Sequence, residues 1–151
     1  MSTIPIKEAI KFGGWLEYDG KFYNGPLVFR FKVLRFARPS PAEIGPRPGA
    51  PALEGVLWGL SMQVVNLNKT AISPVEIHHV MRLVDQDGFE FPVLGNLQQL
   101  EGPIAASVNR LTYGYQPLLP KIKVAGLMLF ALPDEENSYS ILLKDGSIKE
   151  V

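Results

Sequence analysis

The two histidines are the first residues to test for catalytic chemistry, because imidazole serves both as a general base and as a metal ligand. They are adjacent, as His78 and His79, in a segment at 75–84 in which apolar and polar residues alternate. Neighbouring side chains of a strand point to opposite faces, so the two rings cannot readily bind one metal ion together. The alternation predicts a core or interface position for His79 and a solvated one for His78. A hydrolase with an unfamiliar histidine site is therefore only an alternative hypothesis.

No other group of residues points to catalysis or to a metal centre. The chain has no cysteine, which excludes thiol nucleophiles, zinc–thiolate sites and disulfides. The stretch Asp85-Gln86-Asp87-Gly88 has the composition of a calcium loop, but its glycine is fourth rather than sixth, so we interpret it as a hairpin turn. We therefore expect a protein that is not an enzyme and that needs no metal or cofactor to fold.

Aromatic side chains are the stronger candidates, and the function they favour is binding. Tyr113 and Tyr115 flank a glycine in a region predicted to be loop, where amphipathic rings can contact a partner. The alternative is that these two rings cap the open end of the core. Trp15, Tyr18 and Tyr23 lie in a second aromatic-rich segment near the N-terminus, and we include them among the candidate binding residues.

Strands must position these side chains, because period-two alternation of apolar and polar residues is the main pattern along the chain. Three Asp-Gly pairs, at 19–20, 87–88 and 145–146, suit tight turns that need positive φ. The first pair predicts a hairpin over residues 15–23. Longer alternating segments predict strands at 27–36, 56–64, 75–84, 124–132 and 139–144. The segment 124–132 is apolar on both faces, as expected of a central strand.

The pattern as a whole predicts an all-β fold, most simply an antiparallel β-sandwich of two packed sheets, with a barrel as the alternative. Residues 104–111 could form one short helix, and we expect no other. Trp58 shares the alternating face of Leu60 and Met62, so we expect it to be buried. We divide the single domain into N-terminal strands and hairpin at 1–36, a Pro-rich loop at 37–55 and a sandwich core at 56–146.

Size and charge exclude several classes of protein. The chain has 151 residues, 46% of them hydrophobic, which is enough for one domain with a single core. Fifteen Lys plus Arg residues balance fifteen Asp plus Glu residues, so no net field attracts a nucleic acid. No apolar run approaches the roughly 20 residues that span a bilayer. The N-terminus has no secretory signal, so we expect a cytoplasmic protein, or an extracytoplasmic one if an upstream signal has been removed.

The order and spacing of five segments carry a further inference. They are MQVVN at 62–66, RLVDQDGFEF at 82–91, LP at 119–120, GLMLFALP at 126–133 and YSILL at 139–143. With these segments, residues 56–146 resemble the telokin-like immunoglobulin-fold domains of bacterial lipoproteins and secreted proteins. The resemblance implies an immunoglobulin-like sandwich of unassigned function without catalytic residues. The chain departs from the family at Lys121, where these domains usually have glycine, and in having no export signal.

The leading hypothesis is a non-enzymatic β-sandwich that presents a surface to a protein partner or to itself. The hairpin at 15–23 is expected to be an addition to the basic sandwich, with more apolar surface than two isolated strands can keep in water. We therefore expect a homodimer or partner interface that includes Trp15 and Tyr23. The alternative is a small-ligand or carbohydrate-binding module that uses loop aromatics.

Overall fold

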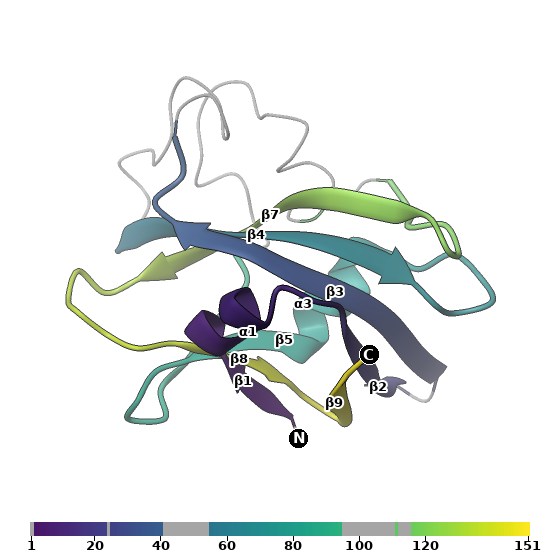
Figure 1. Cartoon of the computed structure of the whole chain (residues 1–151), viewed down its shortest axis with the longest axis horizontal. Helices are drawn as coiled ribbons and strands as arrows, with labels where there is room; N and C mark the ends of the chain where they lie inside the picture. The colour runs from purple at the N-terminus through teal and green to yellow at the C-terminus, as the bar shows by residue number, and fades with distance from the viewer. Residues whose placement is uncertain (1, 24, 41–54, 95–110, 112–115) are drawn as a thin grey trace.

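A computed structural model of the chain describes residues 2–23, 25–40, 55–94, 111 and 116–151. Two sheets pack face to face, and the apolar core lies between them (Figure 1). Every strand pairing within each sheet is antiparallel. The prediction of an all-β antiparallel sandwich is therefore confirmed, and the barrel alternative is not needed.

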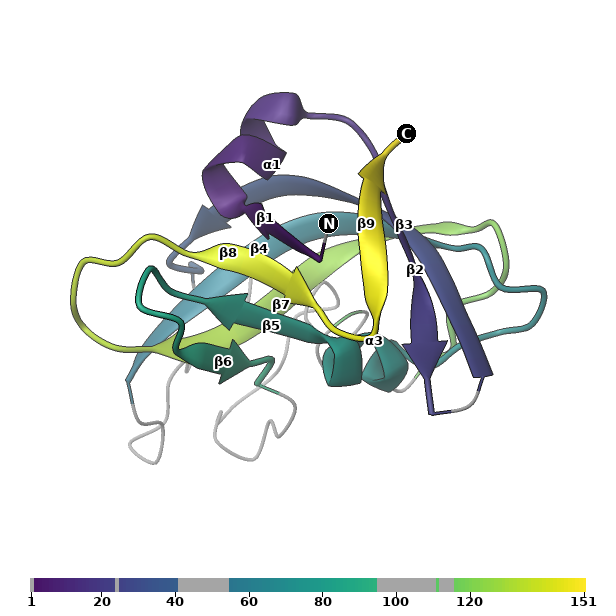
Figure 2. The same cartoon turned by 90° about the horizontal axis from the view of Figure 1, so that it is seen from below.

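The described residues form one sheet of five strands and one of four. In order across the larger sheet the strands are β7 (Lys123–Leu132), β4 (Val56–Asn66), β3 (Gly25–Ala37), β2 (Leu16–Phe22) and β9 (Gly146–Glu150). In order across the smaller sheet they are β1 (Thr3–Pro5), β8 (Ser140–Leu143), β5 (Met81–Val84) and β6 (Glu90–Pro92). Figure 2 shows β8, β5 and β6 side by side in one layer and β4 and β7 in the layer behind it.

The core is built from the inner faces of the strands, largely as the alternation predicts. The inner face of β3 is fully covered and consists of Leu27, Phe29, Phe31 and Val33. Leu60 and Met62 of β4 are buried in the same core cluster as Leu83 and Ile141 of the smaller sheet. Trp58 is only half-buried, because it lies near the beginning of β4, at the margin of the core. The expectation of a fully buried Trp58 was therefore wrong.

The predicted turn at residues 19–20 is also wrong, because β2 runs straight through Asp19 and Gly20. Gly20 pairs with Gly146 of β9, and the buried ring of Tyr18 lies across it. The Tyr18 hydroxyl donates a hydrogen bond to the carbonyl oxygen of Lys144. A side chain at position 20 would overlap the Tyr18 ring, so the glycine is needed for packing rather than for a turn.

As a consequence, the N-terminal segment is not an addition to the sandwich. The chain reverses instead after Phe22, which pairs with Gly25, and β2 pairs with β3 on one side and with β9 on the other. Strands β2 and β3 therefore both lie inside the five-stranded sheet, while β1 is at the edge of the smaller one. Strands β2 and β3 thus belong to the same sandwich as the strands that follow residue 55.

The other two Asp-Gly pairs do form turns. At the first, Asp85 accepts backbone hydrogen bonds from Asp87 and Phe89 through its carboxylate, and Gly88 has a φ of 90°. This turn joins β5 to β6, as predicted. At the second, Asp145 has a φ of 60°, but the turn leads from β8 in one sheet to β9 in the other, so it is not a hairpin.

The segment predicted as a strand at 75–84 is a helix followed by a strand. Helix α3 (Pro74–Val80) begins with a capping box, in which Ser73 accepts from the backbone of Val75 and Glu76 accepts from the backbone of Ser73. The proline at the first helical position adds to this start signal. Strand β5 follows directly, so the alternation that suggested one long strand spans two elements.

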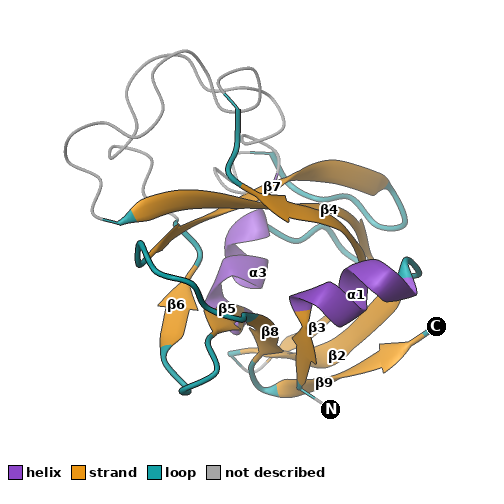
Figure 3. Cartoon of the chain, turned by 60° about the vertical axis from the view of Figure 1, so that its left-hand side comes forward, coloured by secondary structure: helices purple, strands orange, loops and turns teal. Residues whose placement is uncertain are grey.

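A second short helix, α1 (Ile6–Phe12), ends at Gly13, which has a φ of 66°. Each helix contacts one strand of each sheet: α1 contacts β1 and β3, and α3 contacts β2 and β5 (Figure 3). The described residues thus contain two helices where at most one was expected. The helix predicted at 104–111 lies outside the described residues except for Leu111. The seven-residue helices of the described segments are too short to cross a membrane.

Strand β7 is apolar on both faces, as predicted, but it does not lie in the middle of a sheet. It pairs with β4 and is the last strand on its side of the larger sheet. Leu127, Met128, Leu129 and Phe130 are all buried, so side chains on both of its faces are covered. The Pro-rich loop predicted at 37–55 begins after β3, and residues 41–54 of it lie outside the described residues.

Candidate binding site at the open end of the sandwich

The residues singled out from the sequence for binding do not come together. Tyr18 is fully buried, so its ring is not available to a partner. Trp15 is half-buried on the outer face of the larger sheet, with the Lys32 ammonium 5.1 Å from the centre of its ring. Tyr23 is 83% exposed. Tyr113 and Tyr115 lie outside the described residues.

The two histidines exchange the roles that the sequence predicted for them, because their segment is helical. His78 is half-buried, and its Nε2 donates to the carbonyl oxygen of Leu111. Burial lowers the pKa of His78, and the neighbouring His79 lowers it further. His79 is exposed, with its ring 5.2 Å from that of Phe22. Among the described residues neither imidazole has a carboxylate and a hydroxyl within reach, as a hydrolytic site would need.

Four half-buried aromatic rings, from both sheets, meet at one end of the sandwich. Phe36 and Trp58 stack with their ring centres 5.0 Å apart. Tyr139 lies edge-on to Phe36 at 6.1 Å and to Phe91 at 5.9 Å. Three of the rings lie on the inner faces of their strands, and Tyr139 directly precedes β8; all four pack against the margin of the core. The larger sheet supplies one pair of rings and the smaller sheet the other.

A β-bulge in β3 places Phe36 in this cluster. Val33 pairs with Met62, but the register then shifts, and Arg35 pairs with Ser61. Leu34 is the extra residue, and it is exposed. Without the bulge, strict alternation would turn Arg35 inward and Phe36 outward. The sequence gives no signal of the bulge, so Phe36 could not be found by counting along the strand.

Two hollows are lined in part by rings of this cluster, and we call them together the open-end groove. The larger, of about 400 Å³, is lined by Phe36, Asn137 and Tyr139 and by residues of α1 that include Ile6 and Ile10. The smaller, of about 210 Å³, is lined by Phe36, Trp58, Pro133, Glu135, Glu136, Asn137 and Tyr139. The two share three residues, so they adjoin. Exposed aromatic and aliphatic surface with a few polar groups is the usual composition of a binding site.

Side-chain amides hold the loop that forms one wall of the groove. Gln86, in the β5–β6 turn, donates to Asn137 Oδ1 at 2.7 Å and accepts from the backbone of Ser138 at 3.0 Å. Asn137 Nδ2 in turn donates to the Tyr139 hydroxyl and to Glu135 Oε1, each at 3.2 Å. The wall is thus fixed to the neighbouring turn. Less conformational entropy of this loop is therefore lost when a ligand binds.

A third hollow, of about 470 Å³, lies at the opposite end of β3 and β4. Asn68, in its lining, accepts from the backbone of Val28 at 2.7 Å and donates to the carbonyl oxygen of Pro26 at 2.9 Å. Its polar groups therefore hold the surrounding turns together. The described residues of its lining include no aromatic ring, and we regard it as structural.

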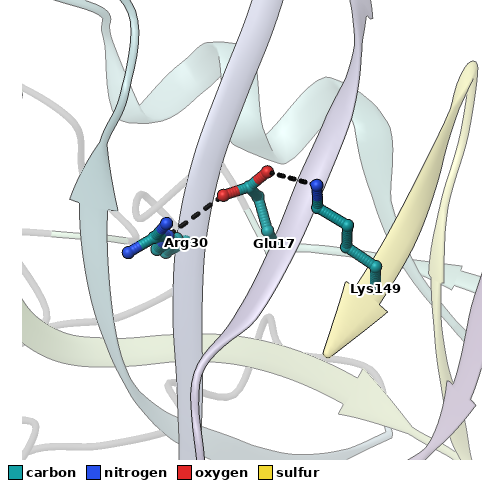
Figure 4. Close-up of polar contacts among 3 residues, drawn as sticks. All are labelled: Glu17, Arg30 and Lys149. Carbon is teal, nitrogen blue, oxygen red and sulfur yellow. Dashed lines mark hydrogen bonds and ion pairs between the residues drawn. The ribbon is translucent and has the colours of Figure 1, made fainter. Parts of the chain in front are cut away.

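The outer face of the larger sheet carries an ion-pair ladder across three strands (Figure 4). Glu17 of β2 accepts from Arg30 Nε of β3 at 3.0 Å and pairs with Lys149 Nζ of β9 at 3.3 Å. The hydrogen bond from Arg30 is the main cause that lowers the pKa of Glu17, against an opposing effect of burial. These three residues are cross-strand neighbours, so the ladder holds β2 between its partners.

The described residues contain no group of three or more side chains suited to hold a metal ion. The Asp85 carboxylate is engaged by the backbone of its own turn, as the hairpin interpretation of that segment predicts.

Two packed antiparallel sheets with an apolar interior define a β-sandwich protein. The crystal structure of MPT63, a secreted protein from Mycobacterium tuberculosis, has a similar fold: the TM-score is 0.56, and the match covers 89% of this chain and 92% of that one. The two sequences are 17% identical, so the likeness concerns the fold alone. No protein-family model matches the chain, and no curated protein matches it in sequence.

Proposed function

We propose that this protein is a non-enzymatic interaction module that binds a protein partner in the open-end groove. The observation that carries the proposal is the meeting of four half-buried rings at one open end of the sandwich, beside two adjoining hollows. Two hollows in a row suit an extended polypeptide better than a single compact ligand. Ile10, which is 37% exposed, extends the apolar surface onto α1.

The experiment is affinity capture from the native host with a matched pair of variants. Ile10→Asp places a charge in the groove, and Ile122→Asp makes the same change at an isoleucine that is 52% exposed and does not line the groove. We expect the wild type and Ile122→Asp to retain a partner that Ile10→Asp loses. The purified partner should then bind the wild type in calorimetry. Equal capture by all three proteins, or none by the wild type, would contradict the proposal.

The second candidate function is a small-ligand or carbohydrate-binding module. It is favoured by the aromatic rings and the Asn137 amide of the smaller hollow, since sugars commonly stack on aromatic rings while amides bind their hydroxyl groups. Saturable shifts of groove resonances in an NMR titration with a set of monosaccharides and disaccharides would support it.

Self-association is the other form of the interaction hypothesis, and the exposed ring of Tyr23 favours it. Tyr23 packs edge-on against Phe22, with the ring centres 4.5 Å apart, and most of its surface is free. A homodimer through this end of β2 would be disrupted by Tyr23→Asp. Sedimentation equilibrium of the two proteins at high concentration tests it, and a monomeric wild type would refute it.

We infer further that the chain is a telokin-like immunoglobulin-type domain that works outside the cytoplasm. The segments quoted above and the likeness in fold to MPT63, a secreted protein, support this inference. Fractionation of the native host, followed by detection with an antibody, tests the placement. Recovery of the protein only in the cytoplasmic fraction would overturn it.

A further inference from the structure

We propose that the smaller hollow of the open-end groove receives an ammonium group, carried by a lysine side chain of the protein partner. The proposal rests on the function proposed above and names the chemistry that the site would recognise. We call this hollow the acidic hollow. The lining residues that would contact the ammonium group are Phe36, Trp58, Tyr139, Glu135 and Glu136.

Three aromatic rings line the acidic hollow in differing orientations. Phe36 and Trp58 are inclined at 23° to each other, and Tyr139 stands at 66° to Phe36. The face of an aromatic ring carries partial negative charge, which attracts cations within about 6 Å. Rings at different angles around a space of about 210 Å³ suit a compact ammonium better than a planar guanidinium, which stacks flat on one ring.

The charges of the lining have one sign. Glu135 and Glu136 line the acidic hollow, and the described residues of its lining include neither lysine nor arginine. By contrast, Lys7 and Glu8 in the neighbouring hollow offset each other. The chain as a whole has zero net charge, so the negative sign is a local property of this site.

The two carboxylates differ in how they are held. Glu135 Oε1 accepts a hydrogen bond from Asn137, which orients the carboxylate, and none of the described residues bonds to its second oxygen. Glu136 is exposed and makes no ion pair with any described residue. A carboxylate at the rim of an aromatic hollow adds electrostatic attraction without the large desolvation cost of a buried ion.

The test uses the tryptophan of the site as its reporter. The chain has two tryptophans, so Trp15→Phe leaves Trp58 as the single tryptophan, whose emission can be excited selectively. The probes are two capped peptides, Gly-Lys-Gly and Gly-norleucine-Gly, which differ only in the ammonium group. We expect the lysine peptide to change Trp58 emission saturably and to bind about tenfold more tightly than the norleucine peptide. Added salt should weaken the lysine peptide alone.

A pair of charge-neutralising variants locates the binding. The double variant Glu135→Gln/Glu136→Gln should weaken the lysine peptide about fivefold and leave the melting temperature unchanged. Glu150→Gln, on β9 and outside the groove, should have no effect. Equal affinity for the two peptides, or equal weakening by both sets of variants, would overturn the proposal.

The outcome of this test is separable from that of the proposed function. If neither peptide binds but capture of a partner still depends on Ile10, the ammonium proposal fails and the groove remains a protein-binding site. If capture does not depend on Ile10, the proposed function fails whatever the peptides do.

Discussion

Asn66 is the single buried polar residue of the described core, with 1% of its surface exposed, and we predict that its replacement by alanine destabilises the fold. It stands at the end of β4, where the chain must turn. Its Nδ2 donates to the carbonyl oxygens of Thr70, at 2.9 Å, and Leu118, at 2.8 Å. Its Oδ1 accepts from the backbone of Asn68 at 2.7 Å. The side chain thus joins the turn after β4 to the segment that precedes β7.

The magnitude follows from counting what is lost and what remains paired. Each of the three hydrogen bonds contributes about 1 kcal/mol, so their removal costs about 3 kcal/mol. A further penalty for unpaired carbonyl groups is small, because Leu118 still accepts from the backbone of Ile72 at 3.1 Å and Thr70 is exposed to water. We therefore expect the free energy of unfolding to fall by about 3 kcal/mol and the melting temperature by roughly 6 to 12 °C.

Urea denaturation followed by tryptophan fluorescence measures this change. Asn68→Ala is the matched control, because Asn68 is only half-buried and makes two side-chain hydrogen bonds, so we expect a loss of about 1 kcal/mol. Asn66→Asp should be at least as harmful as Asn66→Ala at neutral pH, since it removes both donors and buries a charge. A loss below about 1 kcal/mol for Asn66→Ala would refute the reasoning, because it would mean that water replaces the side chain without cost.

Three more predictions concern packing and pH. Gly20→Ala should cost about 1 to 3 kcal/mol in urea denaturation, because the new Cβ must displace the buried ring of Tyr18; an unchanged midpoint would show that the ring can move freely. Glu17→Gln should lower the free energy of unfolding by at most about 1 kcal/mol at pH 7, since Lys149 is largely exposed. Because the pKa of Glu17 lies below its ordinary value of 4.5, the wild type should be the more stable protein above pH 4.5 and lose this advantage as the pH falls further. An advantage that persists in acid would contradict this. Burial lowers the pKa of His78 below its ordinary value of 6.5, so protonation of its ring favours the unfolded state. As the pH falls below 6.5, the wild type should therefore lose stability and His78→Gln should lose less. Parallel pH profiles of the two proteins would count against a buried neutral imidazole.

The interpretation of single residues from the sequence was least reliable where packing overrides a local signal. Asp19-Gly20 has the composition of a turn, yet its glycine is required by the Tyr18 ring that lies across it. The alternation at 75–84 suggested a strand, although Ser73 and Glu76 already formed the pattern of a capping box. That second signal was present in the sequence and could have been recognised.

The candidate binding site was beyond the reach of sequence patterns. Trp58 was predicted as core, and Phe36 and Tyr139 were only ends of predicted strands. They meet because β3, β4 and β8 end or begin at the same edge of the sandwich, and because the bulge at Leu34 turns Phe36 inward. Contacts between residues this far apart depend on strand order and register, which no single segment specifies.

The sequence by itself determined the class of fold and most of the inner face of the sheets. Alternation has a fixed period of two in any strand, so Leu27, Phe29 and Phe31 had to share one side, and that side had to be buried. Tertiary structure alone decided which strands are neighbours, which glycine faces a ring and where the core opens to solvent. Those features depend on how two sheets pack, and the free energy of that packing comes from contacts between segments that are distant along the chain.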